Sequence, residues 1–255
     1  MATWGRILFA MSLALMGALG ILFHDFTPMS QMVPKAIAGH DAITIVAGAI
    51  LLAGGIALSV PRTARLAALA LTALLLLFEL WLRVPPVVVH PGIEGNWYGV
   101  SETLTLIAGG WTIFSSLPAR AGEALARFGS IRIGQILFGL ALPAIGLSHF
   151  FYLELTAPII PSWLPFHVPL AYFTGAAHFA AGIGILLGVL PRLAATLEAV
   201  MVSLFTPLVW VPVVIAMPDR YSNWTEITVS TAITGAAWAV AASFRDRPWS
   251  FARRA

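Results

Sequence analysis

The chain has no cysteine in its 255 residues. It therefore cannot carry out thiol–disulfide exchange itself, and it cannot hold a metal ion or an iron–sulfur cluster through cysteine. Spacings typical of other metal and haem sites, such as HxxxH and ExxH, are also missing. We therefore predict no metal-ligating residues from these patterns. Among cofactors, a quinone is possible, and a haem held by two imidazoles is an alternative to it.

Charge is also scarce. Charged residues make up 10% of the chain and apolar residues 59%, and the mean hydropathy is +0.90. Ordinary soluble domains carry about 25% charged residues, so the composition excludes that class. The pI near 9.8 comes from scattered arginines rather than from a basic run interleaved with aromatic residues. No nucleic-acid partner is expected.

Most of the sequence consists of long apolar runs. About 20 predominantly apolar residues are enough to span a lipid bilayer as a helix. The sequence predicts an all-α polytopic membrane protein with eight transmembrane helices. The runs cover residues 6–23, 42–60, 66–84, 99–118, 133–153, 170–190, 194–216 and 225–243.

The chain repeats itself at a nearly constant interval. ILFAMSLALMGALG (7–20) aligns with ILFGLALPAIGLSH (136–149), with five identities in 14 positions. Residues 47–64 align with 177–194 at an offset of 130, and an Asn-Trp pair recurs in the second half. The second copy also indicates that the first run is a retained helix rather than a signal peptide. Collinear matches predict two tandem four-helix units, a parallel repeat.

The predicted units have simple boundaries and a predicted orientation. Residues 1–118 form the first unit, 119–132 a cytoplasmic linker, and 133–255 the second unit with a short basic tail. Of the 14 lysines and arginines, 11 fall on one predicted side of the membrane. The positive-inside rule places both termini in the cytoplasm and the proline-rich loops outside.

Three stretches of the second unit carry a family resemblance. GLSHF (146–150), PLAYFTG (169–175) and AHFAAGIGILLGVLPRLA (177–194) resemble the DoxX-like family of small bacterial integral membrane proteins. Family members are typically single four-helix units, so the resemblance implies a tandem or fused form in the bacterial inner (plasma) membrane. Some relatives are linked to redox work beside quinone-reducing complexes. Where other members often carry a carboxylate on the second helix, this chain has His178.

Ionisable residues inside predicted spans are costly and are functional candidates by default. From the helical rise, His149 and His178 lie about 7 and 12 Å below the outer ends of their helices. Three prolines then end the helix after His149, which predicts a loop over both histidines. The candidate ligand-binding residues are His149, His178, Glu226, Glu154, Trp224 and Tyr172. Their expected counterparts in the first unit are Glu79, Arg83 and Glu102.

Each ionisable residue also has a structural interpretation. Glu79 and Arg83 are spaced for an ion pair within one helix. Glu198 is expected near the cytoplasmic end of its helix, where it would meet the helix dipole or reach the interface. His149 and His178 could be buried neutral histidines that only complete the packing. The residues expected to be solvated in loops are His24, Asp25, His40, His90 and His167.

Three classes of function fit these features. The first is a redox-associated accessory that binds a quinone-like or other small apolar molecule in a pocket open to the extracytoplasmic side. The second is a small-solute carrier; against it, the sequence predicts no interrupted helix at matching positions of the two units. The third is a non-catalytic assembly or scaffold subunit of a membrane complex, with a redox complex or a homodimer as partner. No reaction follows from the residues alone.

Overall fold

The computed structural model describes residues 2–25, 35–119 and 129–250, and every regular element in these ranges is helical. Six helices are long and apolar enough to cross a membrane. Pro28 and Pro34 of the first proline-rich loop, and Arg120 and Arg127 of the linker, lie outside the described residues. The six helices are Thr3–Phe23, His40–Ser59, Ala64–Val89, Ile131–Phe151, His167–Leu187 and Pro191–Ala216.

The first half of the chain forms four long helical segments. They agree with the predicted runs to within a few residues, except that the third continues to Val89 and the fourth begins at Glu94. The elements are α1 (Ala2–Phe23), α2 (His40–Ser59), α3 (Ala64–Phe78) with η1 (Glu79–Arg83) and α4 (Val84–Val89), and α5 (Glu94–Ser116).

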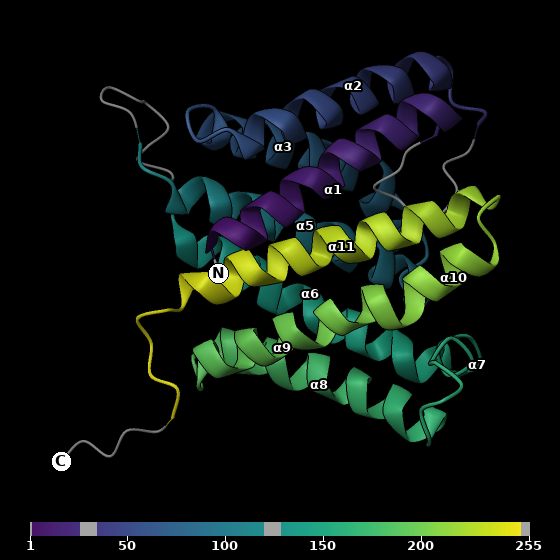
Figure 1. Ribbon diagram of the computed structural model, residues 1–255, viewed down its shortest axis with the longest axis vertical. Helices are drawn as coiled ribbons and strands as arrows, with labels where there is room; N and C mark the ends of the chain where they lie inside the picture. The colour runs from purple at the N-terminus through teal and green to yellow at the C-terminus, as the bar shows by residue number, and fades with distance from the viewer. Residues whose placement is uncertain (1, 26–34, 120–128, 251–255) are drawn as a thin grey trace.

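Within the described residues, the second half has the same order of long segments, and its proline-rich loop also contains a short helix. The added helix is α7, which lies between the first two long helices of this half (Figure 1). The elements are α6 (Ile131–Phe151), α7 (Leu153–Thr156), α8 (His167–Leu187), α9 (Pro191–Phe205) with η3 (Thr206–Trp210) and α10 (Val211–Ala216), and α11 (Tyr221–Ser243).

The third long segment of each half contains a π-helical turn, η1 in one and η3 in the other. Prolines lie in or just after each turn, and a proline has no N–H to donate to the helical ladder. Wider turns of this kind are rare and occur frequently at functional sites. The turns widen these segments without breaking them, because Ala64–Val89 and Pro191–Ala216 each remain one continuous helix.

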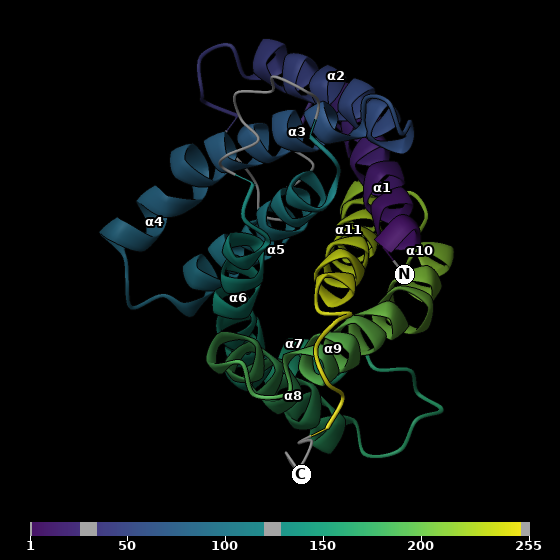
Figure 2. The same cartoon turned by 90° about the vertical axis from the view of Figure 1, so that its left-hand side faces the viewer.

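The helices interleave across the two halves. Within the first half α1 packs on α2, α2 on α3, and α3 on α5; within the second half α6 packs on α8, α8 on α9, and α9 on α11. Across the halves, α1 packs on α11 and α6 on α5, while α5 and α11 contact each other at the middle of the bundle (Figure 2). Each half thus buries its first helix against the fourth helix of the other.

Glycines allow the closest of these crossings. A Cβ on Gly17 would collide with the backbone of Gly48, and a Cβ on Gly146 would collide with the backbone of Gly175. The two α2 and α8 glycines are 127 residues apart, three fewer than the sequence alignment of these helices assumed. Helices rich in Gly, Ala and Leu offer several nearly equal alignments, and only the packing distinguishes them.

The ends of the helices separate into two groups. The start of α1, the end of α11, and the α2–α3 and α8–α9 turns lie at one end of the bundle, at the left of Figure 1. The α7 segment and the α10–α11 turn lie at the opposite end. Arg62, Arg65 and Arg192 belong to the first group, and Arg220 belongs to the second. The basic residues of the described turns are therefore concentrated at one end.

Candidate functional site

A cavity of about 670 Å³ opens among α5, α6, α8, α9, η3 and α11. One side of it is lined by α7 and the segment after it, through Leu155, Thr156, Ile159 and Ile160. Most of its lining is aliphatic or aromatic, and the polar groups come from several helices. The polar lining residues are Tyr98, Glu102, Ser148, His149, Tyr152, Thr156, Thr174, His178, Glu198, Glu226 and Ser230.

The crossing of α6 and α8 brings the two predicted histidines together. Their ring centroids are 5.4 Å apart, and both side chains line the cavity. Each histidine follows by three residues a glycine at which the helices meet, Gly146 before His149 and Gly175 before His178. Residues three apart share a helix face, so the glycines that allow close approach also aim the imidazoles at each other.

His178 is the more buried of the two, with 2% of its surface exposed. Its Nδ1 lies 2.9 Å from Oε1 of Glu198 on α9, and both side chains are buried. The expectation that Glu198 interacts with the helix dipole or reaches the interface was wrong. Counted from the α8–α9 turn, Glu198 lies about 10 Å and His178 about 13 Å along their helices, so they meet at similar depth.

His149 is held by its neighbour on α8. The hydroxyl Oγ1 of Thr174 lies 3.1 Å from Nδ1 of His149. The same hydroxyl donates to backbone carbonyls of its own helix. Because a hydroxyl has one hydrogen, a Thr174 that donates to the backbone accepts from the Nδ1–H of His149. The two imidazoles are thus both anchored through Nδ1, one by a carboxylate and one by a hydroxyl.

Carboxylates from α5 and α11 complete the wall. Glu226 lines the cavity, as the sequence predicted for its rim, and Glu102 lines it as well. Glu102 accepts a hydrogen bond from the Tyr98 hydroxyl at 3.2 Å. The sequence predicted Glu102 as a counterpart of these residues in the first unit, and the structure places it in the same cavity as the histidines. It joins the cavity of the histidines because α5 packs directly on α6 and α11.

Arg83 reaches this wall from the π-turn η1. Its Nη2 lies 3.9 Å from Oε2 of Glu102, and both side chains are buried. The guanidinium passes over Gly99, where an added Cβ would lie 2.7 Å from Nη1. The sequence predicted an ion pair within one helix with Glu79; the pair with Glu102 joins two helices. Glu79 is buried in the same turn, and the cavity lining does not include it.

Three of the predicted ligand residues do not line the cavity. Glu154 is exposed on α7. Tyr172 packs on Phe150 with ring centroids 5.5 Å apart, and the indole N–H of Trp224 donates to the carbonyl of Pro218 at 2.8 Å. The aromatic residues that do line the cavity were missed by the sequence reading. They are Tyr98, Tyr152, Phe205 and Trp210.

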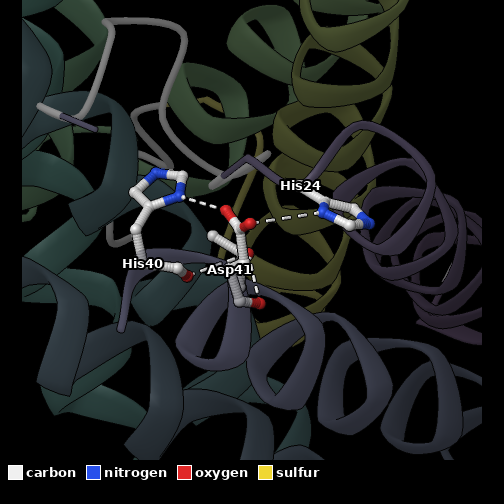
Figure 3. A network of polar contacts seen from close by, with 4 residues as sticks. His24, His40 and Asp41 are labelled. Atoms are coloured by element: carbon white, nitrogen blue, oxygen red, sulfur yellow. Dashed lines mark hydrogen bonds and ion pairs between the residues drawn. The ribbon is translucent and has the colours of Figure 1, made fainter. Parts of the chain in front are cut away.

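A second polar cluster links the end of α1 to the start of α2 (Figure 3). Nδ1 of His40 lies 3.3 Å from Oδ1 of Asp41, and Nδ1 of His24 lies 3.8 Å from Oδ2 of the same carboxylate. The prediction that His40 is solvated was wrong, because only 5% of its surface is exposed. Among the described residues, no group of three or more histidines and carboxylates is arranged to hold a metal ion. This cluster connects two helices.

The chain matches no family model, no curated protein and no solved structure.

Proposed function

We propose that the protein is a DoxX-like membrane accessory of a redox system that binds a small, mostly apolar, quinone-like molecule in the cavity beside His149 and His178. The observation that carries the proposal is the buried His178–Glu198 pair, 2.9 Å apart, on the wall of an otherwise largely apolar cavity. Ionisable groups at such depth are costly, and they persist where they serve a ligand or proton. If these residues only filled space, apolar side chains of similar volume would do so without the cost of removing polar groups from water.

The size and lining of the cavity suit a ring molecule. Ligand pockets typically enclose about 300–1,000 Å³ and combine apolar walls with a few placed polar groups. The volume of about 670 Å³ lies within that range. Phe205 and Trp210 offer flat apolar surfaces, and the histidines offer hydrogen-bonding nitrogens. These features favour a molecule with a polar ring over a purely aliphatic lipid.

The protein chain is proposed to cross the membrane eight times. In addition to the six apolar helices, α5 and α11 each contain 23 residues, long enough at 1.5 Å per residue to span a core of about 30 Å. Their serines, threonines and glutamates lower their hydropathy, and many of these side chains are buried inside the bundle. Helices at the middle of a bundle need less apolar surface because they meet little lipid.

The two halves are proposed to form a parallel repeat. Asn96 and Trp97 donate side-chain hydrogen bonds to the carbonyls of His90 and Pro91, respectively. Asn223 and Trp224, 127 residues later, donate to the carbonyls of Met217 and Pro218. The π-turns η1 and η3 have the same separation. Matching packing partners for all four long segments also support this interpretation.

The proposed location is the bacterial inner membrane with both termini cytoplasmic. The concentration of arginines at the end of the bundle that holds the start of α1 and the end of α11 supports this orientation. The cavity side near α7 would then face outside. Alkaline phosphatase fused after residue 160 is expected to be active, and an inactive fusion there would reverse the orientation.

The binding proposal is tested with purified full-length protein in lipid nanodiscs. Mass spectrometry of the extracted lipids is expected to find a quinone enriched over the surrounding bilayer. A short-chain quinone analogue is expected to bind the wild type and to bind the His178→Leu variant at least tenfold more weakly. His167→Leu, which alters a histidine outside the cavity lining, is the matched control. Failure of every quinone and hydroquinone analogue to bind the folded wild type would contradict the proposal.

A carrier for a small solute is the second candidate. It is favoured by one observation, the π-turn in the third long segment of each half. Discontinuous helices at corresponding positions of two repeats form the substrate sites of many transporters, and the π-turns are irregularities at corresponding positions of the two halves. Uptake of the bound analogue into proteoliposomes, faster than into liposomes without protein, would favour this candidate. Binding without uptake would favour the accessory.

A further inference from the structure

The His178–Glu198 pair fixes which nitrogen of the imidazole is available to a ligand. Nδ1 of His178 faces Oε1 of Glu198 at 2.9 Å, the usual arrangement in which Nδ1–H donates to a carboxylate. In a neutral imidazole the other nitrogen, Nε2, is then an acceptor. Nε2 is buried and has no hydrogen-bond partner among the described residues, and the same holds for Oε2 of Glu198. Two acceptor atoms, on two residues that line the cavity, are thus left for a ligand.

Most hydroxyls of the wall already donate elsewhere. Ser148 donates to the carbonyl of Ile145 at 2.7 Å, and Thr156 donates to the carbonyl of Tyr152 at 3.1 Å. Thr174 donates to its own helix. Each hydroxyl has one hydrogen, so these groups have none left for a ligand.

Two carboxylates from α5 and α11 also line the cavity. Glu102 accepts a hydrogen bond from the Tyr98 hydroxyl and lies beside the Arg83 guanidinium, so these two polar neighbours are donors. Glu226 accepts or donates according to its proton, and Tyr152 carries a further hydroxyl on the wall. Around His178, however, the atoms without partners are acceptors.

We propose that the cavity selects a molecule whose polar end donates hydrogen bonds at His178, a hydroxyl-bearing quinol or phenol in preference to the carbonyl-bearing quinone. Glu198 acts as the positioning residue, because its carboxylate sets the tautomer of His178. A ligand hydroxyl would donate to Nε2, whereas a ligand carbonyl would place one acceptor against another. This inference rests on the proposed binding function and names the chemical form of the ligand.

The expected selectivity follows from the cost of a buried acceptor without a donor. Binding sites built to satisfy a ligand hydroxyl discriminate strongly against analogues that lack it, because their own buried groups are then left unpaired. We expect the hydroxyl form to bind at least tenfold more tightly than the same ring without a donor.

The test compares three ligands that share one ring: a short-chain hydroquinone, its quinone, and the dimethyl ether of the hydroquinone. Affinity for wild-type protein in nanodiscs is measured by calorimetry without oxygen. The ether removes the donor without changing the redox state of the ring. Tighter binding of the hydroquinone than of both others supports the inference. Equal or tighter binding of the quinone or the ether overturns it and leaves the binding function intact, whereas no binding of any ligand overturns both.

A variant tests the role assigned to Glu198. In Glu198→Gln the side-chain amide can donate to Nδ1, which allows the hydrogen of His178 to move to Nε2. We expect the preference for hydroquinone over quinone to fall at least tenfold in this variant. Glu154→Gln, on exposed α7, is the matched control and should keep the wild-type preference. An unchanged preference in folded Glu198→Gln overturns the assignment, and the wild-type comparison of ligands decides the inference if this variant does not fold.

Discussion

At the scale of single residues, the cavity depends on a polar pair that neither partner could sustain alone. His178 and Glu198 are both almost fully buried, and each provides the other with a hydrogen bond at 2.9 Å. Losing both residues of such a pair and losing only one of them have different effects on the free energy of unfolding. Replacing both partners with apolar residues of similar volume is often nearly neutral, whereas removing one leaves the other buried without compensation. The pair is therefore better explained by a role in binding than by stability.

A double-mutant cycle measures this asymmetry. We expect Glu198→Leu and His178→Leu each to destabilise the protein, by up to about 3–5 kcal/mol for loss of one buried partner. The double variant should lose less than the sum of the two single variants. Thermal unfolding in detergent gives the comparison, with Glu154→Leu on the exposed surface as control. Additive losses would mean that the two side chains do not interact.

The residues of the pair also mark how far the sequence could predict the site. His149 and His178 could be predicted because each is an ionisable residue that stands in a long apolar run. Glu198 was misplaced because its depth was counted on its own helix, without its neighbour across the α8–α9 turn. Tyr172 and Trp224 were expected at the cavity, but their direction around the helix depends on packing. No local pattern in the sequence specifies that direction.

At the scale of helices, the site depends on how closely α6 and α8 approach. A Cβ at Gly175 would lie 2.9 Å from the carbonyl oxygen of Gly146 and 2.9 Å from Cβ of His149. In membranes, small residues allow backbones to meet, and packing rather than the hydrophobic effect holds the helices together. The glycine pair thus sets both the crossing and the distance between the two imidazoles.

Enlarging one glycine should separate the histidines. We expect Gly175→Val to reduce ligand affinity by tenfold or more and to lower the unfolding temperature, because the backbone of α6 cannot move away without losing its contacts. Gly92→Val is the matched control, since a Cβ there would meet no atom within 4 Å. Calorimetry and thermal unfolding of both variants give the measurement. Wild-type affinity in Gly175→Val would show that the crossing does not position the site.

The helical elements were predicted more completely than their irregularities. Eight apolar runs predicted the eight long helical segments, because length and hydropathy are local properties. The π-turns could not be placed in the same way. Arg83 sits at the end of η1 and reaches Glu102 over Gly99, a contact between residues on two different helices. The π-turn η1 therefore carries a residue whose partner, Glu102, lies on a different helix.

At the scale of the whole molecule, the two halves are not independent bundles. α1 packs against α11, where a Cβ on Gly5 would collide with Trp238 and Ala239. α6 packs against α5 at the corresponding crossing, where a Cβ on Gly134 would collide with Thr112. The cavity likewise takes its wall from both halves, since Glu102 lies on α5 and the histidines on α6 and α8. A site shared in this way exists only when the halves are assembled.

This interleaving predicts the behaviour of a divided chain. When residues 1–119 and 129–255 are produced as separate polypeptides in one cell, we expect them to co-purify and to bind the hydroquinone as the intact protein does. Each half produced alone should be degraded or aggregate, because the glycine-lined faces of α1 and α11, or of α5 and α6, would be exposed to lipid without the close packing that stabilises them. Affinity purification through a tag on one half gives the measurement, and a tag on the other half is the control. A second half that accumulates alone and binds ligand would contradict a cavity built by both halves, since it lacks the Glu102 and Tyr98 of α5.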